Sequence, residues 1–281
     1  MSAMALLLAL GAATLHATWN ALVKGAGDRV LTMGAVIAGH AMAGLFLCLI
    51  SAPPAPESWP FIAASVVIHW LYYGFLIAAY RVGDLSFVYP IARGVAPVLV
   101  SLSAWLWADE QMSGTAWTGI LLVSGAIFLL ATGRQMAQAR SATVMWALLA
   151  GLTIAAYSVV DGIGVRASGN NAPGYIGWLF LAGSPISLAF LWQRRQVLGP
   201  SSARALGWGL AGGIVSAAAY GMAILAMQIA ALGAVSAVRE SSVIIAALIG
   251  VVWFRERPWQ KRLLAAAMVV CGVVLLVLAT R

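Results

Sequence analysis

Ten long apolar segments, separated by short polar breaks, dominate this sequence. An α-helix needs about 20 apolar residues to cross the hydrocarbon core of a bilayer, and each segment is about that long. A transmembrane β-barrel would instead show alternating polar and apolar residues, whereas these runs are continuous. The segments lie at about 2–24, 30–51, 59–82, 85–107, 115–132, 142–166, 174–192, 206–231, 233–254 and 259–280.

The composition excludes a water-soluble globular fold. Hydrophobic residues make up 63% of the chain and charged residues 9%, whereas soluble domains carry roughly 25% charged residues. A chain with so few charges cannot cover a water-facing surface. We therefore predict an all-α polytopic membrane protein with ten transmembrane helices. The lipid bilayer of the cell (inner) membrane is its expected surrounding.

Several classes of function leave no signature in the sequence. The net charge is +8, but no run of five or more basic residues occurs, so nucleic-acid binding is not expected. Cys48 and Cys271 each stand alone in an apolar run, without a CxxC motif or a Cys/His cluster for a metal. No GxSxG, HExxH or Walker A motif occurs. We therefore expect no cofactor, no metal site and no catalytic site.

Two stretches far apart in the sequence are similar to each other. The stretch YYGFLIAAYRVGDLSFVYPIARGVAP, which begins at Tyr72, aligns with AYGMAILAMQIAALGAVSAVRESSVI, which begins at Ala219. This alignment predicts two repeats, residues 1–140 and 141–281, of five helices each within one membrane domain. An odd number of helices per repeat inverts the second repeat relative to the first. Inverted repeats are typical of secondary transporters, which bind solutes near the midplane between the repeats.

Three motifs resemble those of a known family. They are HATWNALVK at 16–24, SFVYPIARGVAPVLVSLSAWLWADE at 86–110, and ALGAVSAVRESSVIIAALIGVVWFRERP at 231–258. Together with ten helices in two halves, they resemble the drug/metabolite transporter superfamily, in its EamA-type ten-helix branch. The resemblance covers the whole chain.

The resemblance implies a basket-like fold around a central cavity, lined by the first, third, fourth, sixth, eighth and ninth helices. Members of the superfamily carry amino acids, sugar derivatives and nucleotide-linked or purine metabolites, and many bacterial members are exporters. The resemblance extends to the branch that exports aromatic amino acids. A fused ten-helix chain needs no partner to complete its inverted pair, so a monomer is expected.

Four charged residues lie inside the predicted helices: Arg93, Asp161, Arg239 and Glu240. An isolated charge in a bilayer is costly and usually marks a functional site. One interpretation is that these residues pair, for example Arg239 with Asp161, only to stabilise packing. The alternative is that they line a solute cavity, since Arg93 and the Arg239–Glu240 pair occupy matching positions in the two repeats.

Aromatic and polar side chains recur at helical spacing near these charges. We predict a substrate site that combines both groups. Arg93 or Arg239 would hold the carboxylate of an amino acid, Glu240 or Asp161 its ammonium, and the aromatic rings an apolar side chain. The predicted substrate-binding residues are Trp19, Asn20, His69, Tyr72, Tyr73, Tyr89, Arg93, Tyr157, Asp161, Tyr220, Arg239 and Glu240.

Three functions are compatible with these residues. The first is export of small metabolites, specifically aromatic or large neutral amino acids, by alternating access. The second is exchange or import of phosphorylated or nucleotide-linked metabolites, because basic residues suit anionic phosphate. The third is a membrane enzyme acting on a lipid-linked substrate through His16, His69 and Glu240, for which the sequence holds no motif.

The loop charges fall unevenly on the two sides of the predicted topology. If the N-terminus were cytoplasmic, only Arg166 and Arg281 would face the cytoplasm, and the other basic loop residues would face outward. The positive-inside rule therefore favours the opposite orientation, with both termini outside. The resemblance implies cytoplasmic termini, so both orientations remain open at this point.

Overall fold

The computed structural model describes residues 1–23, 28–82, 85–131, 141–197, 199, 202–245 and 259–279. Their helices follow the apolar segments closely. In the first half these are α1 (Ala3–Val23), α2 (Arg29–Ile50), α3 (Trp59–Val82), α4 (Leu85–Trp107) and α5 (Gly114–Ala131), with a 3-10 turn η1 (Pro56–Ser58) before α3. In the second half they are α7 (Ser141–Arg166), α8 (Ala172–Ala182), α9 (Pro185–Gln193), η2 (Arg195–Val197), α10 (Ala203–Ile229), α11 (Leu232–Arg239) and α13 (Trp259–Leu278).

The predicted fold class is confirmed: the protein is an all-α polytopic membrane protein. Among the described residues, eight helical stretches are long and apolar enough to cross a membrane. The apolar helix Gly114–Leu130 is only slightly shorter, and α11 lies within the ninth predicted span. Local signals begin two of the helices as expected from capping. The Asp28 carboxylate accepts from Val30 N and Leu31 N at the start of α2, and the Asn171 side chain accepts from Gly174 N at the start of α8.

Two predicted spans are interrupted. The seventh, 174–192, is divided into α8 and α9 at Gly183 and Ser184, where Pro185 begins the second helix. Proline lacks the backbone N–H that a continuous helix needs and is tolerated at a helix start. In the ninth, α11 ends at Arg239, Glu240 lies in a turn, and residues 241–245 are helical again. The remainder of this span, 246–254, lies outside the described residues.

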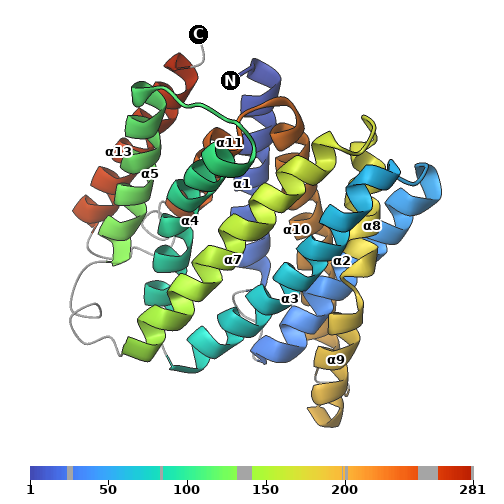
Figure 1. The fold of residues 1–281 in the computed structure, drawn as a ribbon. Coiled ribbons are helices and arrows are strands. Elements are labelled where there is room, and N and C mark those ends of the chain that lie inside the picture. Colours follow the sequence, from blue (N-terminus) through green and yellow to red (C-terminus); the bar gives the residue numbers. More distant parts are fainter. Residues whose placement is uncertain are drawn as a thin grey trace.

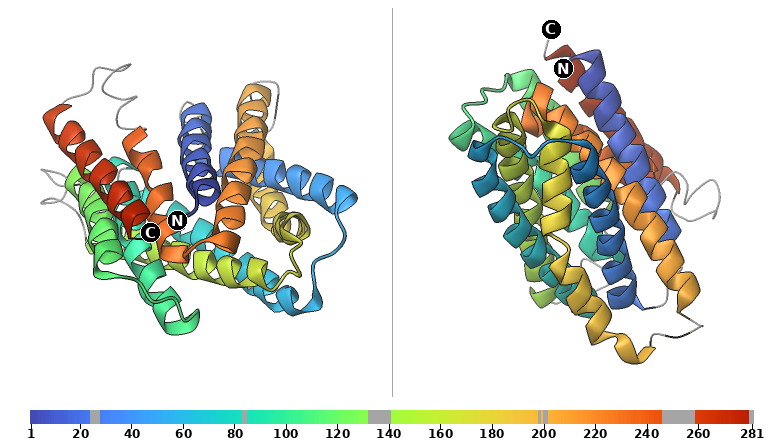
Figure 2. Two further views of the ribbon diagram at one scale, coloured as in Figure 1. Left: turned by 90° about the horizontal axis from the view of Figure 1, so that it is seen from above. Right: turned by 90° about the vertical axis from the view of Figure 1, so that its right-hand side faces the viewer.

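The helices form one bundle in which the two halves of the chain interlock (Figure 1). Helix α1 packs on α10, α3 packs on α7, and α4 lies between α7 and α5. Figure 2 shows α5 and α13 side by side at one edge, away from α2, α8 and α9. The two termini lie at the same end of the bundle (Figures 1 and 2). This end is called the terminus end below, and the other the distal end.

Glycines allow the closest helix contacts. Gly39 of α2 and Gly213 of α10 meet backbone to backbone, because a Cβ on Gly39 would lie 2.8 Å from the Gly213 Cα. Gly119 of α5 and Gly272 of α13 meet in the same way, because a Cβ added to either glycine would lie 2.7 Å from the carbonyl oxygen of the other. Small residues at helix crossings are typical of membrane bundles, where close packing replaces the hydrophobic effect.

Candidate solute cavity

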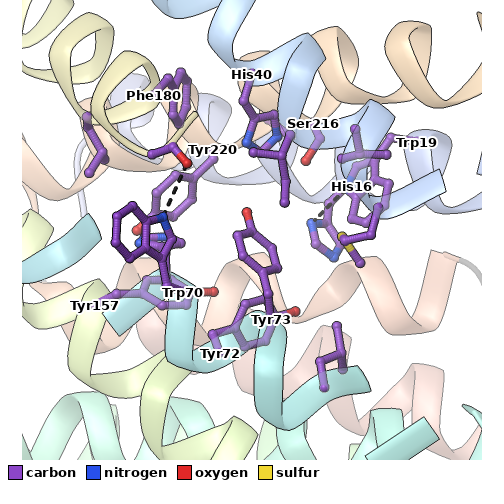
Figure 3. Close-up of a pocket in the computed structure, with 18 of the residues that line it drawn as sticks. His16, Trp19, His40, Trp70, Tyr72, Tyr73, Tyr157, Phe180, Ser216 and Tyr220 are labelled. Carbon is purple, nitrogen blue, oxygen red and sulfur yellow. Dashed lines mark hydrogen bonds between the residues drawn. The ribbon is translucent and has the colours of Figure 1, made fainter. Parts of the chain in front are cut away.

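Side chains from eight helices enclose a cavity in the middle of the bundle (Figure 3). All six helices named by the resemblance contribute, namely α1, α3, α4, α7, α10 and α11, and α2 and α8 contribute as well. Eight of the predicted site residues line the cavity: Trp19, His69, Tyr72, Tyr73, Arg93, Tyr157, Tyr220 and Arg239.

The remaining four predicted residues are placed differently. Asp161 and Glu240 are buried behind the cavity wall, with 0% and 1% of their surface exposed. Asn20 points back along α1, where its Nδ2 donates to the carbonyl oxygen of His16 at 2.7 Å. The side chain of Tyr89 lies outside the described residues.

Arg93 and Glu240 form the central ion pair, which joins α4 to the turn after α11. The Arg93 Nε lies 2.6 Å from the Glu240 Oε2. The Arg93 Nη2 also donates to the Ser242 hydroxyl at 3.3 Å. The cost of burying each charge is therefore offset by its partner. This pair connects the two halves of the chain at matching positions of the predicted repeats.

Arg239 does not pair with Asp161, so the suggested structural pair of these two residues is wrong. Its guanidinium lies over the ring of Tyr220, 5.3 Å from the ring centroid. Within the described residues, no carboxylate lies at ion-pair distance from Arg239. Arg239 therefore presents a positive charge to the cavity, where the face of Tyr220 and the hydroxyl of Tyr157 contact it.

Asp161 is satisfied by tyrosine hydroxyls rather than by an arginine. The Tyr175 hydroxyl donates to its Oδ1 at 2.9 Å, and the Tyr220 hydroxyl donates to its Oδ2 at 2.5 Å. The ring of Tyr220 thus lies between two charged groups, with Asp161 at its hydroxyl and Arg239 at its face.

An aromatic cluster forms the wall between α3, α7 and α10. The ring of His69 stacks on Tyr157 with centroids 4.1 Å apart, and Tyr220 meets Tyr157 edge to face at 5.6 Å. Tyr72 and Tyr73 lie beside them, 5.3 Å apart. On the opposite wall, the Trp19 Nε1 donates to the His16 Nδ1 at 3.2 Å (Figure 3). Flat rings on facing walls suit a flat apolar group between them.

Among the lining residues that sequence reasoning missed, three carry aromatic rings: His40, Trp70 and Phe180. His40 is not among the predicted substrate-binding residues, yet it lines the cavity, and its buried Nε2 has no hydrogen-bond partner among the described residues. Phe180 packs against His40 with centroids 5.1 Å apart. Trp70 donates to the carbonyl oxygen of Gly183 at 3.2 Å, where α8 ends (Figure 3). The break before Pro185 was the signal that could have drawn attention to this region.

The cavity extends toward the distal end. Its lining reaches Trp19 near the end of α1 and Met33 near the start of α2, both of which lie toward that end (Figure 1). The terminus end is closed by polar contacts. Arg166 pairs with the Glu110 Oε1 at 2.7 Å and donates to the carbonyl oxygens of Met227 and Ala230, while the Glu110 Oε2 accepts from Leu232 N at 2.8 Å.

Fold and cavity together define a polytopic helical membrane protein that encloses an aromatic and positively charged site. Comparison with known proteins shows which family profile and which solved structure this chain resembles. Residues 141–278 match the sequence profile of the EamA-like transporter family, which supports the resemblance to the drug/metabolite transporter superfamily. A solved structure titled only "Crystal structure of protein" shares the fold, with a TM-score of 0.80 and 18% identity over 100% of this chain and 99% of that one. No curated protein matches the sequence significantly.

Proposed function

We propose that the protein is a secondary transporter that exports small carboxylated metabolites with an aromatic or large apolar group, such as aromatic amino acids. The observation that carries this proposal is Arg239, a buried cation at the cavity wall without a carboxylate partner among the described residues. An unpaired charge inside a membrane protein is costly unless water or a ligand compensates it. A solute carboxylate is a suitable ligand, because arginine can bind it through two parallel hydrogen bonds.

The cavity lining favours a carboxylate over a cation. It contains Arg93, Arg239 and the three histidines, and no carboxylate among the described residues. Arg93 is already neutralised by Glu240, which leaves one net positive charge at Arg239. Both acids considered for an ammonium group, Asp161 and Glu240, are engaged elsewhere. The ammonium of an amino acid would lie against tyrosine faces and hydroxyls instead.

The aromatic walls favour a flat apolar group on the solute. His69, Tyr72 and Tyr157 form one wall, and Trp19 belongs to the opposite one. A solute ring placed between them gains stacking and edge-to-face contacts as well as burial of apolar area. The unpaired His40 Nε2 offers a further polar contact for such a solute.

Alternating access is supported by the way that the helices pack. Suppose that the first five spans correspond in order to the last five, so that α1 matches α7, α3 matches α10 and α4 matches α11. The contact between α1 and α10 then corresponds to the contact between α7 and α3, and the contact between α4 and α7 corresponds to the contact between α11 and α1. The contacts α2–α8, α4–α11 and α5–α13 correspond to themselves. A bundle with this exchange symmetry has an alternative state in which the two halves swap roles. Rocking between the two states would expose the cavity to each side in turn.

The charge distribution favours an orientation in which the cavity extends toward the cytoplasm, as loading for export requires. The described basic residues Arg29, Arg194 and Arg204 lie at the start of α2, the end of α9 and the start of α10, at the distal end toward which the cavity extends (Figure 1). The positive-inside rule places this end in the cytoplasm. With that orientation the structure corresponds to a state that loads solute from the cytoplasm. Phosphorylated metabolites remain a second candidate, because the described lining carries cations and no acid.

Counterflow in proteoliposomes tests the proposal. Vesicles loaded with unlabelled solute take up the same labelled solute without any ion gradient, so the assay needs no coupling ion. Labelled L-tryptophan and L-phenylalanine are the expected substrates, with glucose 6-phosphate as the phosphorylated probe. Uptake of the amino acids that Arg239→Met weakens would support the proposal. Uptake of the phosphate ester alone would replace it with the second candidate, and no uptake of any probe would refute it.

A further inference from the structure

Asp161 is a membrane-embedded carboxyl group without an ion-pair partner among the described residues. It lies on α7, one turn beyond the cavity residue Tyr157 and five residues before Arg166 at the terminus end. Its surface is 0% exposed. Within the described part of the chain, no lysine, arginine or histidine nitrogen lies within ion-pair distance of it. Hydroxyl donors cover both oxygens, but they carry no charge.

Two hydrogen-bonded routes connect Asp161 to the cavity. One runs through Tyr220, whose hydroxyl donates to Asp161 and whose ring lines the cavity. The other runs through Ser65, whose hydroxyl lies 3.1 Å from the His69 Nδ1 and beside the Asp161 carboxyl. The His69 Nδ1 also lies 2.9 Å from the carbonyl oxygen of Ser65, which can only accept. A hydrogen bond to this carbonyl oxygen requires the His69 proton to be on Nδ1.

Of the three arginines near Asp161, two form ion pairs with other acids. On α4, Arg93 pairs with Glu240. On α7, Arg166 pairs with Glu110 at the terminus end. Arg239 of α11 lies over the face of the Tyr220 ring, with its guanidinium carbon 5.3 Å from the ring centroid. The remaining titratable neighbours are His69 of α3, Tyr157 of α7, Tyr175 of α8 and Tyr220 of α10.

We propose that Asp161 is a proton-binding site linked to the solute site at Arg239, so that the solute and a proton bind and move together. This inference rests on the proposed transport function. A solute carboxylate beside Arg239 adds negative charge near the face of Tyr220, whose hydroxyl contacts Asp161. Like charges disfavour each other, so the solute favours the protonated form of Asp161. The linkage is reciprocal, and protonation of Asp161 tightens binding of the carboxylate.

The proton balance of the cycle is simple. Asp161 takes one proton from cavity water when the solute binds, and no other bond forms or breaks. The neutral carboxyl group then donates a hydrogen bond instead of only accepting them, and Tyr220 turns its hydroxyl accordingly. When the cavity opens on the other side, the carboxylate leaves and the proton follows it into water. A solute with one net negative charge thus crosses without net charge, whereas a zwitterionic amino acid crosses with one positive charge.

Infrared difference spectroscopy on the purified protein tests the proton site without any solute. We expect a protonated carboxyl C=O band that appears as the pH is lowered stepwise. The band should be lost in Asp161→Asn and kept in Glu57→Gln, which removes an exposed carboxylate in η1. Tyr175 is buried outside the cavity lining, so Tyr175→Phe should move the midpoint to higher pH by removing one donor to the carboxylate. A band that persists in Asp161→Asn, or no band, would refute the site.

Tryptophan counterflow at equal pH on both sides tests the linkage. The KM of the wild-type protein should fall several-fold as the pH is lowered, whereas Asp161→Asn should transport with a KM independent of pH. Glu57→Gln should behave like the wild type. Solute efflux should also acidify the outer solution, measured with a pH dye. A wild-type KM that does not change with pH would refute this inference and leave the transport proposal intact. If no solute is transported, the transport proposal fails, and the infrared experiment alone decides whether Asp161 binds a proton.

Discussion

The Nε of Arg93 lies 2.6 Å from the Oε2 of Glu240, and the two side chains are only 4% and 1% exposed. The contact joins α4 in the first half of the chain to the turn that ends α11 in the second. The turn is therefore not a defect in the ninth span. It places Glu240 against Arg93 while Arg239, the adjacent residue, faces the cavity.

Breaking this pair from one side should destabilise the protein more than removing both charges. Arg93→Met or Glu240→Met leaves a buried charge without its partner, which typically costs about 3–5 kcal/mol. The double variant leaves no charge and should recover most of that loss. Thermal unfolding of the four proteins in the same detergent completes a double-mutant cycle. Losses that simply add would show that the pair contributes no coupling.

Arg239 should behave in the opposite way, affecting transport but not stability. Within the described residues it has no carboxylate partner, so Arg239→Met leaves no unpaired acid behind. We expect the KM for tryptophan to rise about 10- to 100-fold. The reason is that the variant loses a hydrogen bond to a charged group, which contributes about 1.5–3 kcal/mol to binding. The matched control is Arg194→Gln, which removes a half-exposed arginine paired with Asp28. Tryptophan amide, which lacks the carboxylate, should compete equally well in the variant and the wild type if the assignment is correct.

Arg166 should hold the terminus end closed. Arg166→Gln removes its ion pair with Glu110 and its contacts with the carbonyl oxygens of Met227 and Ala230. The bundle should then open more often at this end. A cysteine introduced at the buried Val235 of α11, with Cys48 and Cys271 replaced by serine, should react several-fold faster with a membrane-impermeant maleimide.

The control for this accessibility experiment is Arg195→Gln. Arg195 lies at the distal end, where its guanidinium is 4.4 Å from the ring centroid of Trp192, so its loss should leave the labelling rate unchanged. Equal labelling in Arg166→Gln and the unmodified background would show that the polar contacts do not close this end.

The fold could be predicted from the sequence because apolar segments of membrane-spanning length leave few alternatives. Part of the cavity lining could be predicted because a charge or a row of tyrosines inside an apolar segment needs a polar environment. Partner choice could not be predicted. Arg93 and Glu240 are 147 positions apart, and Arg239 is adjacent to Glu240 but faces a different group. The turn at Glu240 determines that Glu240 contacts Arg93 while Arg239 faces Tyr220. No local signal in the sequence marks that turn.

His40 shows a second limit. Its sequence neighbours are apolar and its helix was not expected to line the cavity, so nothing distinguished it from a packed core histidine. Only the approach of α8, which brings Phe180 onto its ring, shows that α2 is part of the cavity wall.

The contact between α2 and α10 should tolerate no added methyl group. A Cβ on Gly213 would collide with the carbonyl oxygen of Val36 and with Gly39, both of them backbone atoms that cannot move alone. We expect Gly213→Ala to lower the unfolding free energy by at least about 1–3 kcal/mol, the usual cost of overpacking. Gly207→Ala is the matched control, because Gly207 lies in the same helix with open space around its Cα. That change should be neutral or stabilise the helix by up to about 1 kcal/mol. Thermal unfolding in detergent compares the two, and equal stability of both variants would show that α2 and α10 do not meet as closely as these glycines require.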